Sequence, residues 1–287
     1  MVENKMIFMT GATSWDGKMR AIKAVREGAT LIVLARNKEK GQTLCDAFKN
    51  EYPDSKGKIE IVEGNLSSLN SVYSACEVIK SKYPVIDMIA NNVGIMNYVT
   101  IKTVDNIDET LQVNLRAPVL ICHLLLENLK KSTDCKVIFT SSGLHQGNIN
   151  FDNLEFNTGF SSFKVYRQSK LGVILMCKLL AEKLLSDTIG LYCQYSGLVR
   201  TNLGHKIGWF SKVIFYLMWV SPQKRSQTLS FLMDTSKVKL TSGEYYVDKK
   251  ITTTTKVSHD MKAAQKLLNR ANVYLNEYVK AKSLILN

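Results

Sequence analysis

Short apolar segments alternate with longer helical segments along almost the whole chain, and this alternation restricts the fold more than any other feature. Met6–Thr10 and Thr30–Ala35 are largely apolar at consecutive positions, as strands covered on both faces are. The segments between them carry apolar residues at three- and four-residue spacing, which is typical of helices packed on a sheet. Further strands are predicted at Ile59–Val62, Ile86–Ala90, Lys136–Thr140, Gly190–Tyr195 and Glu244–Val247.

Repeated strand–helix–strand units with right-handed crossovers produce a parallel, doubly wound sheet. We therefore predict one α/β domain of the Rossmann type over residues 1–287, with seven parallel strands flanked by helices. Ligands of such sheets bind beyond the carboxyl ends of the strands. The predicted helices are Lys18–Glu27, Lys38–Glu51, Ser68–Ser81, Ile107–Lys130, Tyr166–Ser186 and Met261–Lys280.

The chain is basic, with 38 Lys and Arg against 25 Asp and Glu and a formal net charge of +13. The basic residues are spread along the whole sequence, which favours an ordinary solvated surface; attraction to anionic membranes or to a phosphorylated cofactor is the functional alternative. No basic motif with interleaved aromatic residues is present, so nucleic acid is not an expected partner.

Cysteine usage and the N-terminal segment favour a cytoplasmic protein. The six cysteines are scattered, without a CxxC pair or a cluster with histidine, so we expect reduced thiols and no metal site. The first residues lack the apolar core of a secretory signal, and no stretch of 18 apolar residues is present to span a membrane.

A glycine-containing turn follows the first strand, in the sequence TGATSWDGK from Thr10 to Lys18. Gly11 suits a tight turn, and Gly17 suits close packing of helix on strand. With Thr13 and Ser14 between them, the backbone amides at the helix start form a site for a pyrophosphate. A plain strand–helix turn without a ligand is the alternative.

The second predicted strand ends without an acidic residue. A carboxylate there would bind the ribose 2′-hydroxyl of NAD and repel a 2′-phosphate. Arg36 stands in its place, and its guanidinium matches a phosphate. We therefore predict a preference for NADP(H) over NAD(H), with an ordinary surface cation as the alternative.

Four polar motifs follow in order: Asn91-Asn92-Val93-Gly94, Asn114, Ser141-Ser142, and Tyr166 with Lys170 four residues on. Together with the glycine turn, this ordered set resembles the short-chain dehydrogenase/reductase family over nearly the full chain. The segments ARNKEKG and NLSSLNSV resemble the retinol-dehydrogenase-like branch. That resemblance implies an oxidoreductase acting on CH–OH groups with NADP(H), and apolar alcohols, aldehydes or ketones such as retinoids or steroids as substrates.

The resemblance also assigns catalytic roles. Tyr166 would be the general acid/base at the substrate oxygen, and Ser142 would hydrogen-bond that oxygen. A free phenol has a pKa near 10, so the ammonium of Lys170, one helical turn away, would bring the pKa of Tyr166 toward working pH. Asn114 would anchor a water linked to Lys170. The implied cofactor-binding residues are Gly11, Thr13, Ser14, Gly17, Arg36, Asn65, Leu66, Asn92, Gly94, Tyr166, Lys170, Gly197 and Thr201.

The sequence departs from the family pattern in the glycine turn. Trp15 replaces the middle glycine, and Asp16 adds a negative charge where phosphates would lie. Asn65 stands where an aspartate usually receives the adenine amino group. These changes support a rival hypothesis, a catalytically silent binding or scaffold protein that keeps the fold.

The family resemblance implies that residues 201–226 form a lid over the substrate. Within them, 207–220 are mostly apolar with several aromatic residues, which suits a bulky apolar substrate or peripheral contact with an internal membrane. A helix packed in the core is the alternative. Related proteins often associate through the helices after Asn114 and Tyr166, so the resemblance leaves a homodimer as one possible state of assembly.

Overall fold

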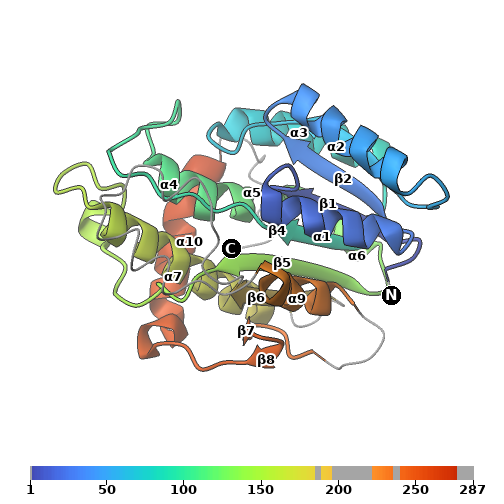
Figure 1. Ribbon diagram of the computed structural model, residues 1–287. Coiled ribbons are helices and arrows are strands. Elements are labelled where there is room, and N and C mark those ends of the chain that lie inside the picture. The colour runs from blue at the N-terminus through green and yellow to red at the C-terminus, as the bar shows by residue number, and fades with distance from the viewer. Residues whose placement is uncertain (1, 185–188, 196–221, 235–239, 277–287) are drawn as a thin grey trace.

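The computed structural model describes residues 2–184, 189–195, 222–234 and 240–276. In these residues eight strands form one sheet in the order β3-β2-β1-β4-β5-β6-β7-β8 (Figure 1). The seven predicted parallel strands are confirmed, and a short antiparallel strand at the β7 edge is added. The strands are β1 Met6–Thr10, β2 Thr30–Ala35, β3 Lys58–Glu63, β4 Met88–Asn91, β5 Cys135–Ser141, β6 Ile189–Tyr195, β7 Tyr245–Val247 and β8 Lys250–Ile251.

Helices cover both faces of the sheet and bury two separate apolar layers. One layer contains side chains of α3, α5, α6, α7 and α10, and the other contains side chains of α1, α2 and α9. The apolar runs in β1 and β2 alternate between these layers, which is why consecutive positions are apolar. The main helices are α1 Trp15–Arg26, α2 Lys38–Glu51, α3 Leu69–Lys82, α5 Ala117–Leu124, α6 Leu126–Lys130, α7 Ser162–Lys183, α9 Pro222–Met233 and α10 Met261–Leu275.

The predicted helix Ile107–Lys130 is wrong as a single element. It is divided into α4 (Glu109–Leu111), the π-helix η1 (Gln112–Arg116), α5 and α6. A π-helix has a wider turn than an α-helix, and the spacing of apolar residues does not reveal this change. Periodicity alone therefore predicts one continuous helix. The remaining short elements are the 3₁₀ helices η2 (Phe151–Asn153) and η4 (Lys256–His259).

The strand order places the candidate site. β1 pairs with β2 on one side and with β4 on the other, so the chain reverses its direction of winding at β1. The carboxyl ends of β1, β4 and β5 therefore meet at the switch point, where ligands of doubly wound sheets bind. The glycine turn, the Asn91–Gly94 segment and Ser142 all follow directly from these strand ends.

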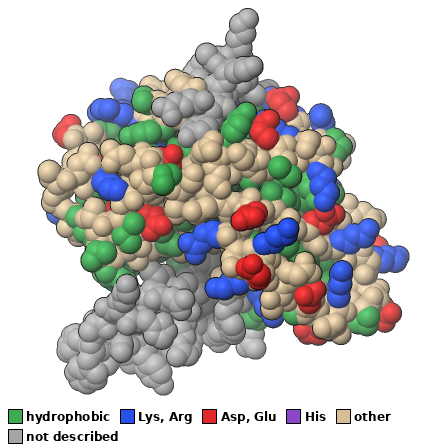
Figure 2. Space-filling model, turned by 90° about the horizontal axis from the view of Figure 1, so that it is seen from above, with side chains coloured by type: hydrophobic (Ala, Val, Ile, Leu, Met, Phe, Trp, Pro, Cys, Tyr) green, Lys and Arg blue, Asp and Glu red, His purple; other side chains and the backbone are tan. Residues whose placement is uncertain are grey.

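The surface carries charges of both signs. On the face seen in Figure 2, Lys and Arg side chains lie among Asp and Glu side chains rather than in one continuous basic patch. This view is consistent with the solvated surface expected from the spread of charge in the sequence. Across the described parts of the chain, the helices are all too short or too polar to cross a membrane.

Candidate active site

Ser142 and Tyr166 meet where β5 gives way to the loop before α7. Ser142 is buried at the end of β5, and Tyr166 is partly exposed in the first turns of α7. Burial raises the pKa of Tyr166 above its ordinary value, and a hydrogen bond with Ser142 opposes the rise. The amide of Leu144 donates to Ser142 Oγ (3.1 Å) and fixes this side chain.

Lys170 lies one helical turn beyond Tyr166 and is almost completely buried. Its Nζ donates to the carbonyl oxygen of Thr140 (2.9 Å) and lies 5.7 Å from the centre of the Tyr166 ring. It also lies 3.0 Å from the position that a Cβ on Gly94 would take. Burial lowers the pKa of Lys170 to about 8.

The pKa of Tyr166 is raised, whereas the sequence analysis expected the Lys170 ammonium to lower it. Desolvation is the largest influence, and it raises the pKa of the phenol. The Lys170 ammonium is directed at the Thr140 carbonyl, and its own pKa is lowered by the same burial. Tyr166 is therefore held as a neutral phenol, the form that donates a proton.

Asn114 connects the loop after β4 to α7. Its Oδ1 accepts from the amide of Ile95 (2.8 Å), and its Nδ2 donates to the carbonyl oxygen of Ile95 (2.9 Å) and to Ser169 Oγ (3.0 Å). Ser169 in turn donates to the carbonyl oxygen of Tyr166 (2.7 Å). The π-helix η1 carries Asn114 into this position, so one amide fixes both the loop after Gly94 and the turn of α7 that contains Tyr166.

The glycine turn after β1 has the form of a phosphate cradle. Gly11 has φ +75°, and a Cβ at Gly17 would lie 1.9 Å from the carbonyl oxygen of Gly11. Ser14 caps α1: its Oγ accepts from the amide of Gly17 (3.1 Å) and donates to the Gly11 carbonyl oxygen (2.7 Å). Thr13 is exposed beside it. A tight turn running into a helix start fits the pyrophosphate of a dinucleotide.

Two residues that the sequence analysis did not single out support this turn. Thr10 Oγ1 accepts from the amides of Asn92 (3.1 Å) and Val93 (3.3 Å), which joins the end of β1 to the loop after β4. Arg20 is buried, and its Nη1 donates to Asn92 Oδ1. An arginine within a helix gives no sequence signal of burial, so only the structure identifies it.

The predicted adenosine side lies at the ends of β2 and β3. Arg36 is exposed directly after β2, next to Asn37, which caps α2. Asn65 Oδ1 accepts from the amide of Ser67 (3.1 Å), and Leu66 is buried. The end of β2 therefore carries an exposed cation, Arg36, beside the capped start of α2.

Aromatic side chains surround the phenol of Tyr166. Tyr195 and Tyr98 both interact electrostatically with it and raise its pKa further. The Tyr195 ring lies 3.6 Å from the position of a Cβ on Gly143, directly after Ser142. His145 is buried in the same loop; its Nδ1 donates to the carbonyl oxygen of Ser142 (2.7 Å), so this ring faces the loop backbone.

Several predicted residues lie outside what the structure describes. Gly197, Thr201 and the lid up to residue 221 belong to this group, as do the side chains of Trp15 and Asp16. The end of the predicted lid, from Pro222, belongs to α9.

The fold, the glycine turn and the Ser–Tyr–Lys arrangement together define a class of protein, and a family model confirms it. The model described as short chain dehydrogenase matches residues 5–209. The chain belongs to this family of oxidoreductases.

Three relatives illustrate its place in the family. It is 29% identical to retinol dehydrogenase 14 of Homo sapiens, covering 95% of this chain and 87% of the relative. It is 28% identical to retinol dehydrogenase 13 of Homo sapiens, covering 85% and 76%. It is 28% identical to dehydrogenase/reductase SDR family member 13 of Bos taurus, covering 90% and 70%.

Solved structures share the fold at low sequence identity. An uncharacterized protein from Mycobacterium paratuberculosis superposes with a TM-score of 0.76 at 23% identity, covering 95% of this chain and 93% of that one. NADPH-bound carbonyl reductase from chicken fatty liver has a TM-score of 0.64 at 18% identity, covering 87% and 99%.

Proposed function

We propose that this protein is an NADP(H)-dependent oxidoreductase that interconverts an apolar alcohol and its aldehyde or ketone, with Tyr166 as the acid/base. The observation that carries the proposal is the meeting of Ser142, Tyr166 and Lys170 at the carboxyl edge of the sheet, with Lys170 Nζ against Gly94. A silent scaffold has no need of this arrangement, so the rival hypothesis is not favoured.

The protonation state of Tyr166 supports proton donation to a carbonyl oxygen. Because burial raises the pKa of Tyr166, its neutral phenol is present at neutral pH and hydrogen-bonds with Ser142. A substrate oxygen placed between these two hydroxyls receives a proton from the phenol and a hydrogen bond from the serine. The nicotinamide cofactor supplies or accepts the hydride when bound.

Lys170 and Asn114 position this pair. Lys170 Nζ stands between the Thr140 carbonyl and Gly94, where it is available to the ribose of a bound nucleotide. Asn114 holds the Gly94 loop against α7 through Ile95 and Ser169. In the oxidation direction the phenol must lose its proton, and the Lys170 ammonium then stabilises the phenolate.

An apolar substrate is supported by the aromatic surroundings of the phenol. Tyr98 and Tyr195 are partly exposed beside Tyr166. Rings at a partly exposed site suit a bulky apolar molecule. The names of the relatives, retinol dehydrogenases 13 and 14, point to the same substrate class.

The cofactor preference is supported by Arg36, exposed at the end of β2 where NAD-specific sites carry a carboxylate. Fluorescence titration of the protein with NADPH and with NADH tests it. We expect NADPH to bind about tenfold or more tightly, and Arg36→Asp to reverse the order. Absence of binding at millimolar concentrations of both nucleotides would overturn the proposed function and restore the scaffold hypothesis.

The acid/base role is tested by Tyr166→Phe, which removes only the hydroxyl. We expect turnover of an apolar aldehyde or ketone with NADPH to fall by at least about 100-fold, with NADPH affinity within about twofold of wild type. Tyr98→Phe makes the same chemical change on the surrounding wall and should retain most of the turnover. Equal turnover of Tyr166→Phe and wild type would exclude Tyr166 as the acid/base.

A further inference from the structure

We propose that Arg20 supplies a fixed positive charge beneath the phosphate cradle and thereby strengthens dinucleotide binding. This inference rests on the proposed function and adds a residue that the family motifs do not contain. Arg20 lies in α1 and is only 2% exposed, and its Nη1 donates to Asn92 Oδ1.

The position of the guanidinium follows from two observations. Long side chains on a helix run toward its N-terminus, so Arg20, one turn beyond Gly17, extends back toward the glycine turn. Its partner confirms this direction, because Asn92 Nδ2 lies 3.2 Å from the position that a Cβ on Gly11 would take. The guanidinium contacts Asn92 and Asn92 contacts Gly11, so only the Asn92 side chain links the buried charge to the turn that would receive a pyrophosphate.

Burial makes this charge effective. A cation at the protein surface, such as Arg36, is screened by water and salt, whereas a buried one acts through a medium of lower dielectric constant. A guanidinium is always charged at physiological pH, so its field at the turn is permanent. The positive end of the α1 dipole points to the same place and adds to that field.

The same charge explains how the altered turn can keep an anion site. By sequence, Asp16 brings one negative charge to the turn where the family motif has an uncharged residue, and Arg20 brings one positive charge. Arg20 also fixes the Asn92 side chain, which the family resemblance places on the cofactor's adenosine and ribose side. Arg20 therefore acts in two ways, by adding positive charge near the turn and by fixing the Asn92 side chain.

Substitution of Arg20 separates a charge effect from a structural one. We expect Arg20→Met to weaken binding of NADPH and of ADP by about tenfold or more, and Arg20→Lys to keep much of the affinity. Adenosine has no phosphate, and its affinity, measured by saturation-transfer NMR, should change by less than about twofold. Arg26→Met is the matched control, because Arg26 is an exposed cation in the last turn of the same helix.

The outcomes distinguish this inference from the proposed function. Equal loss of adenosine and NADPH affinity in Arg20→Met would make Arg20 a purely structural residue and overturn the inference. Wild-type NADPH affinity in Arg20→Met would also overturn it, while the proposed function would stand. A wild-type protein that binds neither NADPH nor NADH would overturn both. Thermal unfolding of each variant verifies that the fold is retained.

Discussion

At Gly17 the absence of a side chain decides whether the turn after β1 can close onto α1. A Cβ there would lie 1.9 Å from the carbonyl oxygen of Gly11 and 2.9 Å from Ser14 Oγ. Backbone atoms cannot move away as the end of a flexible side chain can. Gly11 carries a different requirement, since its φ of +75° is one that other residues rarely adopt.

Gly17→Ala tests this close approach. Alanine usually stabilises a helix relative to glycine by about 1 kcal/mol, so any loss of stability here reports the clash. We expect the free energy of unfolding, measured by urea denaturation, to fall by about 1–3 kcal/mol. Gly143→Ala is the control, because its Cβ would meet its nearest neighbour at an ordinary 3.6 Å. A Gly17→Ala protein as stable as wild type would show that the turn is not this tight.

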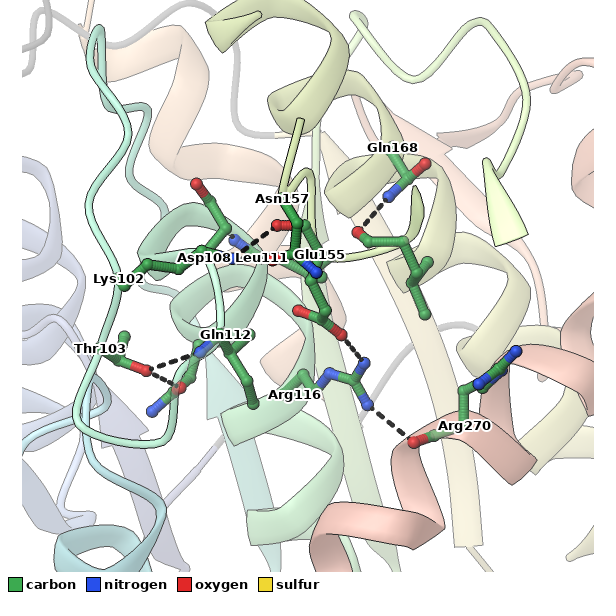
Figure 3. A network of polar contacts seen from close by, with 12 residues as sticks. Lys102, Thr103, Asp108, Leu111, Gln112, Arg116, Glu155, Asn157, Gln168 and Arg270 are labelled. Atoms are coloured by element: carbon green, nitrogen blue, oxygen red, sulfur yellow. Dashed lines mark hydrogen bonds and ion pairs between the residues drawn. The ribbon is translucent and has the colours of Figure 1, made fainter. Parts of the chain in front are cut away.

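Among the elements, the π-helix η1 supports the candidate site through two of its side chains, Asn114 and Arg116. It carries Asn114 on one side and Arg116 on another, and Arg116 forms a buried ion pair with Glu155 (Figure 3). Arg116 Nη1 also donates to the carbonyl oxygen of Arg270 in α10 (3.1 Å), and its guanidinium lies 4.5 Å from the centre of the Tyr274 ring. Two distant segments, the loop with Glu155 and the helix α10, are thus tied to the helix that presents Asn114.

The loop before η1 is joined to the same network. Lys102 Nζ donates to the carbonyl oxygen of Glu155 (2.9 Å) and to Asn157 Oδ1 (2.7 Å), and Thr103 Oγ1 donates to Gln112 Oε1 (2.6 Å) (Figure 3). The Thr103 bond holds a segment with little secondary structure, residues 101–108, against η1, and the Lys102 bonds join this segment to the loop that contains Glu155 and Asn157. The network therefore braces η1, which carries Asn114, against the loop that contains Glu155 and against α10.

Glu155→Gln should be costly because it leaves the Arg116 guanidinium buried without its carboxylate. We expect the free energy of unfolding to fall by about 3 kcal/mol, measured by urea denaturation. Glu77→Gln breaks a surface pair with Lys80 and should change stability by less than about 1 kcal/mol. Equal effects of the two substitutions would mean that the Arg116–Glu155 pair does not stabilise the fold.

For the whole molecule, the buried Lys170 makes stability depend on pH. The pKa of Lys170 is lowered to about 8 in the folded protein, against about 10.4 in an unfolded chain. Between these values the unfolded chain binds a proton that the folded protein has released, so this group's contribution to stability rises with pH. Below pH 8 both states are protonated, and the folded protein carries the full cost of a buried charge.

The Lys170→Met protein should therefore have a larger free energy of unfolding than wild type, and the difference should be greatest below pH 8. We expect that advantage to shrink by about 2 kcal/mol between pH 7 and pH 9.5, measured by urea denaturation at each pH. Thiols of the unfolded chain also titrate in this range, whereas burial raises their pKa to about 12 in the folded protein at Cys76, Cys122 and Cys193. The thiols are common to both proteins, so their contribution largely cancels in the difference. Lys164→Met, an exposed lysine in the same helix, should show no such trend. A constant difference for Lys170→Met would contradict the lowered pKa.

Elements with regular apolar spacing are the ones whose bounds the sequence predicts correctly. Strands such as Thr30–Ala35 and the helix Lys38–Glu51 have the predicted bounds, because local apolar spacing specifies them. The sequence pattern predicts the start of α1 too late, at Lys18, because the first turn of this helix contains a glycine and an aspartate, which are poor helix formers. The capping bond of Ser14 fixes that start at Trp15.

The order of strands and helices, the family, and the residues at the strand ends could be predicted from the sequence, because periodicity and motif spacing are properties of neighbouring positions. Three features of the site could be seen only in the folded protein: Lys170 Nζ donates to the Thr140 carbonyl oxygen, the pKa of Tyr166 is raised, and buried Arg20 donates to Asn92. Each of these depends on desolvation and on contacts between segments far apart in the chain. The spacing of residues along the chain reveals neither the desolvation nor these long-range contacts.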